Sequence, residues 1–284
     1  MNQTVEFRIR PRRGLSSIDL SELWHYRDLV RMLVKRDFAT RYRQTILGPL
    51  WLVLQPLLVS GVFTMVFSIF ARIPTGGAPP GVFYLAGLAG WNYVSQSFVT
   101  TSQLYVVHGP LFGKIYFPRL CLPIATAIGN LFGFAVQVLT VVCLAVIVAV
   151  AWPGAGSIQP QLALLPLVPV MLLQLGLTAI GFGLAIAALT VKYRDLAHLA
   201  SFLVQIWLYL TPVIYPLASV PDRFRLLVSL NPATAAVDVL RGALIGGSTV
   251  SPLELVTGFA TALALAVGGI WFFRQTERSA VDTL

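Results

Sequence analysis

Five intervals of the sequence contain no Asp, Glu, Lys or Arg. They hold 28, 41, 72, 26 and 19 residues and lie at 44–71, 73–113, 120–191, 196–221 and 255–273. A helix needs about 20 mostly apolar residues to cross a bilayer. Each interval therefore has room for one spanning helix, and the longest has room for two. The pattern predicts a membrane protein built from helices.

Turn-forming residues divide these intervals into six predicted spans. The Pro- and Gly-rich turn Pro74–Gly81 separates the first two spans, and Trp152–Gly156 divides the longest interval. The fold class predicted is an all-α membrane protein with one six-helix transmembrane domain at 47–273 and cytoplasmic tails at 1–19 and 274–284. The predicted spans lie at about 50–71, 82–105, 122–151, 162–191, 196–215 and 253–273.

Two further segments have helical patterns but do not suit a span. Residues 20–46 place apolar side chains on one stripe and most basic ones off it, which predicts an amphipathic interface helix on the inner membrane surface. Such a helix is either a membrane anchor alone or also a contact for a cytoplasmic partner. Pro216–Ser251 is interrupted by Pro221, Pro232 and Gly246-Gly247. This favours two short re-entrant or interfacial helices between the fifth and sixth spans.

The charge distribution predicts the orientation in the membrane. Of the 20 Lys and Arg residues, 16 fall on segments that share a side with the N-terminus, ten of them before the first span. The positive-inside rule therefore predicts a multi-pass protein of the cell (inner) membrane with both termini in the cytoplasm. The net charge of +9 is explained by this topology and needs no nucleic-acid partner. With 57% hydrophobic and 11% charged residues, a soluble enzyme is excluded.

Motifs for catalysis and ion coupling are missing from the sequence. The string nearest to a P-loop, Gly109–Ile115, has the wrong spacing and no Ser or Thr after Lys114. HExxH, GxSxG and CxxC do not occur, and the three histidines lie far apart, so no metal site, cofactor or catalytic residue is predicted. The predicted span interiors carry essentially no charge, which disfavours proton or sodium coupling. Energy for uphill transport would then come from another chain.

Aromatic and amide side chains interrupt two of the predicted spans. Sugar rings stack on aromatic faces, and their hydroxyl groups bond to amides, so this composition suits a conduit for a glycan. Helix packing explains the same residues equally well, because polar side chains often bond across membrane helices. The candidate conduit residues are Trp91, Tyr93 and Gln96 in the second span and Trp207 and Tyr209 in the fifth.

Several segments resemble one family of membrane proteins over nearly the whole chain. The most specific segment precedes and enters the first span, and others follow the fourth span, end the fifth or lie in the region after it. They are Tyr26–Leu29, Lys35–Asp37, Arg41–Thr45, Leu47–Trp51 and Gln55-Pro56, then Lys192–Leu196, Thr211–Pro216 and Leu230–Pro232 with Arg241. The chain thus resembles the permease subunits of type-2 ABC exporters of cell-surface polysaccharide, the Wzm, KpsM and TarG group.

The resemblance implies a homodimer bound to two copies of a separate ATPase, which would hold ATP and magnesium. It assigns residues 20–45 to a helix beside the ATPase. The 106–119 loop would carry the coupling helix, and the external gate would lie within 216–251. Candidate coupling residues are His108, Gly109, Pro110, Lys114 and Arg119, and candidate gate residues are Asn231, Pro232, Asp238 and Arg241.

The implied cargo is a lipid-linked polysaccharide such as O-antigen, capsule or a teichoic-acid-like polymer. Basic side chains beside the first span would attract its pyrophosphate, although they are also suited to ordinary membrane lipids. An ABC permease for a drug, lipid or peptide, and a channel or scaffold without an ATPase, remain alternatives. The basic candidates are Arg27, Arg31, Lys35, Arg36, Arg41 and Arg43.

Overall fold

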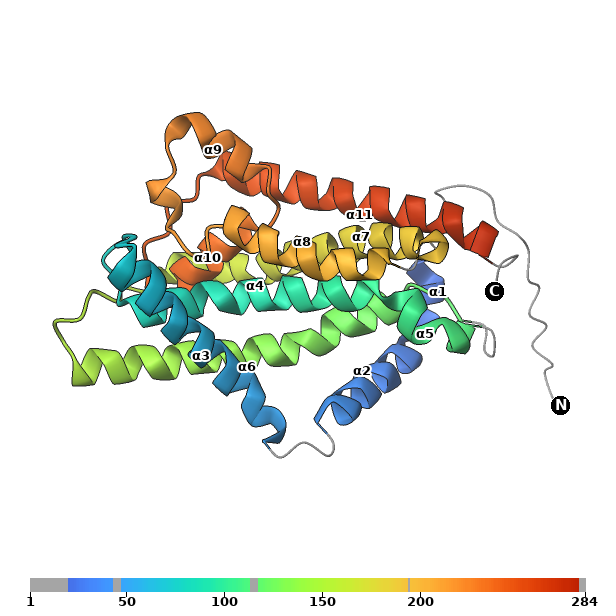
Figure 1. The fold of residues 1–284 in the computed structure, drawn as a ribbon, viewed down its shortest axis with the longest axis horizontal. Helices are drawn as coiled ribbons and strands as arrows, with labels where there is room; N and C mark the ends of the chain where they lie inside the picture. The colour runs from blue at the N-terminus through green and yellow to red at the C-terminus, as the bar shows by residue number, and fades with distance from the viewer. Residues whose placement is uncertain (1–19, 43–46, 113–116, 194, 281–284) are drawn as a thin grey trace.

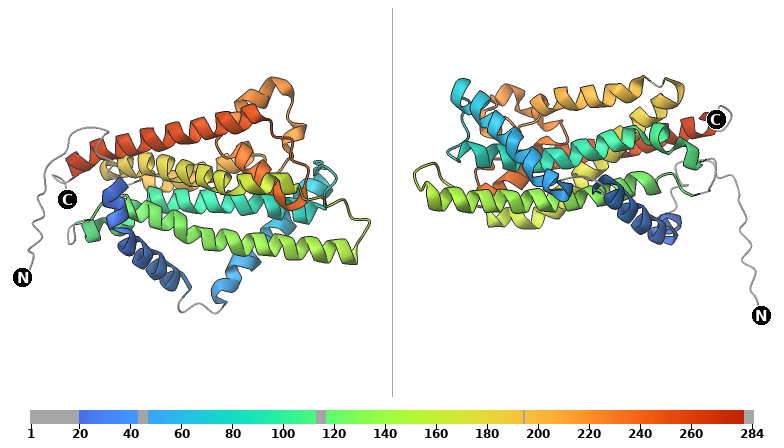
Figure 2. Two further views of the ribbon diagram at one scale, coloured as in Figure 1. Left: turned by 180° about the vertical axis from the view of Figure 1, so that it is seen from behind. Right: turned by 60° about the horizontal axis from the view of Figure 1, so that its bottom comes forward.

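The computed structural model describes residues 20–42, 47–112, 117–193 and 195–280, and these residues form only helices and the turns between them. The longer helices run side by side along the long axis of the molecule (Figure 1). Helices α1 and α5 and the C-terminal end of α11 lie at one end, which we call the α1 end. Helices α9 and α10 and the N-terminal end of α11 lie at the opposite end, which we call the α10 end (Figures 1 and 2).

Four helical segments in the described part of the chain are long and apolar enough to cross a membrane. They are Gly48–Phe70, Cys121–Ala151, Leu162–Lys192 and Pro252–Thr276. Their positions match the predicted first, third, fourth and sixth spans. The all-α fold class predicted from the sequence is therefore confirmed for the described residues, and four of the six predicted spans have the length and hydropathy that a membrane-crossing helix needs.

Two of these segments change helix type along their length. The first begins as η2 (Gly48–Leu50), continues as α3 (Trp51–Phe63) and ends in the wider π-helical turns of η3 (Thr64–Phe70). The segment Leu162–Lys192 begins with the 3-10 turns of η4 (Leu162–Leu167) and continues as α7 (Val168–Lys192). The regular helices are α6 (Cys121–Ala151), α7 and α11 (Pro252–Ala280).

The predicted second and fifth spans are also helical, with changed limits. Helix α4 (Pro80–Ser102) covers the second, and its polar residues lower the mean hydropathy below that of the four apolar segments. Helix α8 (Leu196–Leu210) stops five residues before the predicted end of the fifth span. Thr211 is extended, with φ −100° and ψ 141°, because the following Pro212 disfavours the helical conformation.

Helix α4 is the centre of the bundle. Most of its residues are buried, and it packs against α3, α6, α7, α8 and α10. Two polar pairs link it to α6, because Asn92 donates a hydrogen bond to Gln137 at 3.0 Å and Asn130 donates one to Ser97 at 3.0 Å. These hydrogen bonds offset the unfavourable free energy of burying polar side chains in an apolar interior.

The predicted interface helix is two helices. Helix α1 (Leu20–His25) and helix α2 (Arg27–Tyr42) are separated by a turn at Tyr26. The apolar stripe of α2 packs on α6, where the Phe38 and Phe132 rings meet edge to face at 4.9 Å. Residues 43–46, which complete the predicted segment, lie outside the described residues.

Three short helices occupy the interrupted region before α11. They are η5 (Leu217–Ser219), α9 (Asp222–Ser229) and α10 (Thr234–Ile245). Every α10 residue except Leu244 is buried, whereas Ser229 is the one buried residue of α9. The two short helices expected there are thus present, but only α10 is integrated into the bundle.

Candidate functional site

An aromatic cluster joins α4, α7 and α8 in the middle of the molecule. The indole rings of Trp91 and Trp207 meet edge to face, with centroids 5.5 Å apart. Phe98 and Phe182 stack on each other at 4.8 Å, and each also contacts Trp207. Two predicted conduit residues, Trp91 and Trp207, therefore come together.

The Asn231 side chain connects this cluster to the short helices. Trp207 Nε1 donates a hydrogen bond to Asn231 Oδ1 at 2.9 Å, and the Ala233 amide donates to the same oxygen at 3.1 Å. Asn231 Nδ2 donates to Thr211 Oγ1 at 2.9 Å. The next residue, Pro232, accepts a hydrogen bond from Gln174 Nε2 of α7 at 2.7 Å. The structure thus links a predicted conduit residue, Trp207, to predicted gate residues.

Replacing Trp207 by Phe is expected to destabilise the protein by about 1–3 kcal/mol, because one partly buried hydrogen bond to Asn231 is lost and the smaller phenyl ring leaves part of the space of the indole unfilled. Thermal unfolding of the purified protein in detergent measures the change. The control is Trp24→Phe, since Trp24 on α1 is 70% exposed. Equal melting temperatures for the two variants would show that the Asn231 contact contributes nothing.

The other conduit candidates do not join Trp91 and Trp207. Tyr93 is buried on a different side of α4, where its ring contacts Phe134 of α6 with centroids 6.2 Å apart. Gln96 of α4 and Tyr209 of α8 are exposed, Tyr209 to 59%. Within one copy of the chain, Trp91 and Tyr93 are therefore buried against neighbouring helices, whereas Gln96 and Tyr209 are exposed.

Two predicted gate residues form a buried ion pair on α10. Arg241 donates to Asp238 Oδ1 at 2.7 Å, and the exposed fractions of the two side chains are 3% and 1%. Arg241 also donates to the Pro212 carbonyl at 2.9 Å and lies over the Phe83 ring. Asp238 Oδ2 accepts from Ser248 Oγ at 2.7 Å and from the Thr249 amide at 3.2 Å. The pair fixes α10 to its neighbours.

A small cavity lies beside this ion pair at the α10 end. Its volume is about 180 Å³, and its lining includes Arg241, Thr75, Ser157, Gln159 and Gly246. A water molecule occupies about 30 Å³ in the liquid, so the cavity has room for a few waters. It is far too small for a polysaccharide.

The basic candidates at the α1 end are exposed along α2. Arg31 pairs with Asp28 at 3.2 Å and Arg36 pairs with Asp37 at 2.9 Å. Arg27 lies over the Trp24 ring at 5.4 Å, and Lys35 is exposed. Arg41 belongs to α2 but its side chain is not described, and Arg43 lies outside the described residues. The arrangement presents cations on the surface of the α1 end.

The coupling candidates form a second group at the same end. His108, Gly109 and Pro110 belong to helix α5 (Leu104–Phe112), so the first part of the predicted coupling segment is helical. Burial lowers the pKa of the His108 imidazole, and the Arg36 charge of α2 lowers it further, against a smaller opposite effect of Asp37.

Of the two remaining coupling candidates, Arg119 lies within the described residues and Lys114 does not. Arg119 donates a hydrogen bond to Tyr105 Oη at 3.0 Å, and the Tyr105 ring stacks on Phe273 of α11 at 5.4 Å. Arg119 thus ties the segment after α5 to the long helices. Lys114 lies outside the described residues.

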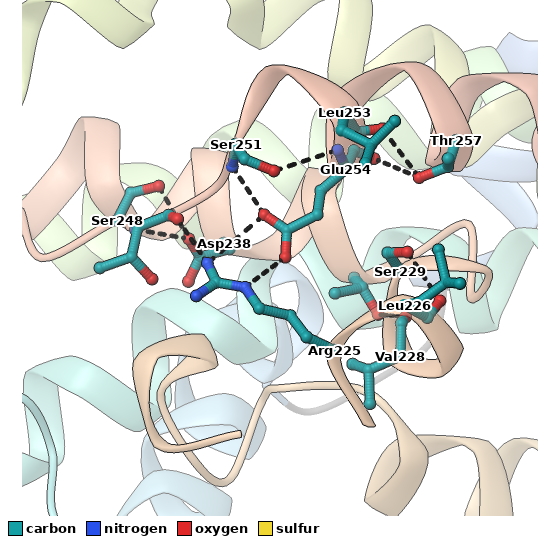
Figure 3. Close-up of polar contacts among 12 residues, drawn as sticks. Arg225, Leu226, Val228, Ser229, Asp238, Ser248, Ser251, Leu253, Glu254 and Thr257 are labelled. Atoms are coloured by element: carbon teal, nitrogen blue, oxygen red, sulfur yellow. Dashed lines mark hydrogen bonds and ion pairs between the residues drawn. The ribbon is translucent and has the colours of Figure 1, made fainter. Parts of the chain in front are cut away.

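A partly exposed ion pair between α9 and α11 was not foreseen from the sequence. Arg225 Nε donates to Glu254 Oε1 at 2.7 Å, as Figure 3 shows. The hydrogen bond to Glu254 raises the pKa of Arg225, so its guanidinium stays charged. A sequence signal for Glu254 was present, since Ser251 and Glu254 have the spacing of a capping box before an apolar run. Nothing in the sequence paired Glu254 with Arg225.

Comparison with known proteins places the chain in a family. The ABC-2 type transporter family matches residues 28–245. The chain is 32% identical to the O-antigen export system permease protein RfbA of Myxococcus xanthus, over 74% of this chain and 78% of that protein. Two proteins of the same description from Klebsiella pneumoniae are each 22% identical over 88% of this chain and over 92% and 94% of their own lengths. The chain therefore belongs to the ABC-2 type transporter family of membrane proteins.

Proposed function

We propose that this chain is the transmembrane subunit of an ATP-driven exporter that moves a lipid-linked polysaccharide of the O-antigen kind across the cell membrane. The observation that carries the proposal is the similarity to O-antigen export permeases along 74% to 88% of the chain. The four apolar segments of spanning length agree with it.

The proposed topology has six spans and both termini in the cytoplasm. Helices occupy all six positions expected from the sequence, and α4 and α8 would cross the membrane inside the bundle with α3, α6, α7 and α11. The location of α1 and the C-terminal end of α11 at one end of the bundle is consistent with an even number of crossings (Figure 1). In this topology the α1 end faces the cytoplasm and the α10 end faces outward.

The polysaccharide would pass between two copies of the chain. Trp91 and Tyr93 are buried within one copy, and the cavity beside Arg241 is too small for a polymer. Exposed Gln96 and Tyr209 remain available to line a passage formed with a second subunit. A homodimer accordingly fits the geometry better than a conduit within a single chain.

The energy would come from two copies of a separate ABC ATPase that bind at the α1 end. The sequence has no P-loop, so ATP and magnesium would be bound by that partner. Helix α5 would transmit the movement of the ATPase to the long helices, through Leu104 in the core and through Arg119. The exposed cations of α2 lie next to it and would attract the pyrophosphate of the carrier lipid.

Deletion of the gene tests the proposed function in cells. We expect surface polysaccharide to be lost and lipid-linked polymer to accumulate in the cytoplasm, because synthesis continues without export. Re-expression of the unaltered chain restores export and controls for effects on neighbouring genes. Unchanged surface polysaccharide in the deletion strain would refute the proposal.

A further inference from the structure

Helices α9 and α10 differ in how firmly they are held, although they follow each other in sequence. Helix α10 is buried against α4 and α7, whereas α9 makes only few contacts with α10 and α11. The large apolar residues of α9 remain exposed, with Leu226 at 63% and Leu227 at 67%. Elements with few buried contacts open at low free energy. Helix α9 is therefore the segment of the α10 end best suited to move.

The C-terminal end of α9 is firmly attached. Thr234 Oγ1, on the first residue of α10, donates to the Val228 carbonyl at 2.8 Å. Asn231, which follows α9, is held by Trp207, Thr211 and the Ala233 amide as described above. Movement of α9 would therefore turn about the corner at Asn231, as hinges commonly lie at the ends of elements.

Along its length, α9 is attached by Arg225. This side chain bridges two acceptors, since Nε donates to Glu254 Oε1 at 2.7 Å and Nη2 donates to the Thr249 carbonyl at 2.7 Å. Arg225 is 30% exposed, whereas Glu254 is 6% exposed. Arg225 can consequently leave for water without unfolding its surroundings, because one side of it is already solvated.

The Glu254 carboxylate stays in position when Arg225 leaves. Glu254 Oε2 accepts a hydrogen bond from the Ser251 amide at 2.6 Å, and the Glu254 amide donates one to Ser251 Oγ at 3.3 Å. These contacts, drawn in Figure 3, belong to the N-terminal cap of α11. Glu254 therefore remains a preformed acceptor to which Arg225 can return.

The Asp238–Arg241 pair on α10 and the Arg225 side chain on α9 both hold Thr249, in the loop between α10 and α11. Asp238 accepts from the Thr249 amide, and Arg225 donates to the carbonyl of that residue. Removing one partner of a buried pair is costly, because it leaves an uncompensated charge. The Asp238–Arg241 pair is therefore a fixed support, while the Arg225–Glu254 pair is the contact that can open.

We propose that α9 is a lid hinged at Asn231 and held closed by a latch between Arg225 and Glu254. The inference rests on the proposed function in one respect: opening of the latch lets the polysaccharide leave at the outward α10 end. Arg225 and Glu254 are positioning residues that control α9. The Asp238–Arg241 pair, expected from the sequence to belong to the gate, is the part that stays still.

Distances between spin labels test the latch without any transport assay. Labels are placed on Leu226→Cys of α9 and Val256→Cys of α11, two exposed positions, after exposed Cys143 is changed to Ser. The full chain is measured with its ATPase in lipid nanodiscs. We expect Arg225→Gln to increase a population of longer distances several-fold. We expect Arg225→Lys, which retains the charge, to fall between Arg225→Gln and the unaltered chain.

The matched control is Arg223→Gln on the same helix. Arg223 lies over the Phe224 ring at 4.7 Å and belongs to neither ion pair, so its replacement should leave the distances unchanged. Equal distance distributions for Arg225→Gln and Arg223→Gln would overturn the latch. This result is independent of whether the protein exports polysaccharide.

A cleavable crosslink tests whether opening is needed for export. A short bismaleimide linker containing a disulfide joins Arg225→Cys to Glu254→Cys in cells that export through this variant. We expect export to stop after crosslinking and to resume after the linker is reduced. Continued export with α9 crosslinked would overturn the proposed role of the lid. Absence of export in the unaltered chain would instead contradict the proposed function, and the spin-label distances would still decide the latch.

Discussion

Replacing Asp238 by Ala is expected to destabilise the protein by about 3–5 kcal/mol, the usual cost of removing one partner of a buried ion pair. The Arg241 guanidinium would stay buried and charged beside Phe83, with the Pro212 carbonyl as its remaining acceptor. Ser248 and the Thr249 amide would lose their acceptor as well. Thermal unfolding of the purified variant in detergent measures the loss.

Two variants make this result specific to the buried pair. Asp222→Ala removes a carboxylate that is exposed at the start of α9, and it should change stability little. The double replacement Asp238→Leu with Arg241→Met removes both charges together and should be less damaging than Asp238→Ala alone. If Asp238→Ala unfolds at the same temperature as Asp222→Ala, the ion pair does not stabilise α10.

Replacing Gly269 by Ala is expected to destabilise the packing of α11 on α7 by about 1–3 kcal/mol, the usual cost of overpacking a filled interior. A Cβ atom at Gly269 would collide with the carbonyl oxygen of Gly181. Backbone atoms cannot move aside as a flexible side chain would, so the two helices would have to separate. Small residues commonly permit such close approach of membrane helices.

The neighbouring glycine provides the control for this substitution. A Cβ atom at Gly268 would meet nothing within 4 Å, although the residue lies on the same helix. Gly268→Ala should therefore leave the melting temperature unchanged or raise it slightly, because Ala favours the helix. Equal melting temperatures for the Gly268→Ala and Gly269→Ala variants would mean that α7 and α11 do not approach as closely as described.

Hydrophobicity was sufficient to predict where the helices lie, because a bilayer requires apolar segments with internally satisfied backbones. The ends of elements were harder to predict. The sequence predicts a fifth span that reaches 215, yet Pro212 ends α8 at Leu210. The apolar stripe of residues 20–46 predicts one continuous interface helix, but the chain turns at Tyr26.

The sequence identifies candidate residue types, but which of these side chains meet depends on contacts between residues far apart in the chain. The aromatic composition drew attention to Trp91 and Trp207, and the structure places them together. Tyr93 carried the same signal but packs on α6, because residues two positions apart on a helix face different neighbours. Arg225 lies 29 residues before Glu254, so only the fold could pair them.

Reconstituted transport tests the central claim most directly. The chain is purified with its ATPase, incorporated into proteoliposomes with radiolabelled lipid-linked polysaccharide, and oriented with the α1 end outside. Adding ATP should move polysaccharide into the lumen, where added glycosidase cannot reach it, and a catalytically inactive ATPase should abolish this protection. ATP hydrolysis without any gain in protected polysaccharide would contradict the claim that this chain is the polysaccharide-conducting subunit of an exporter.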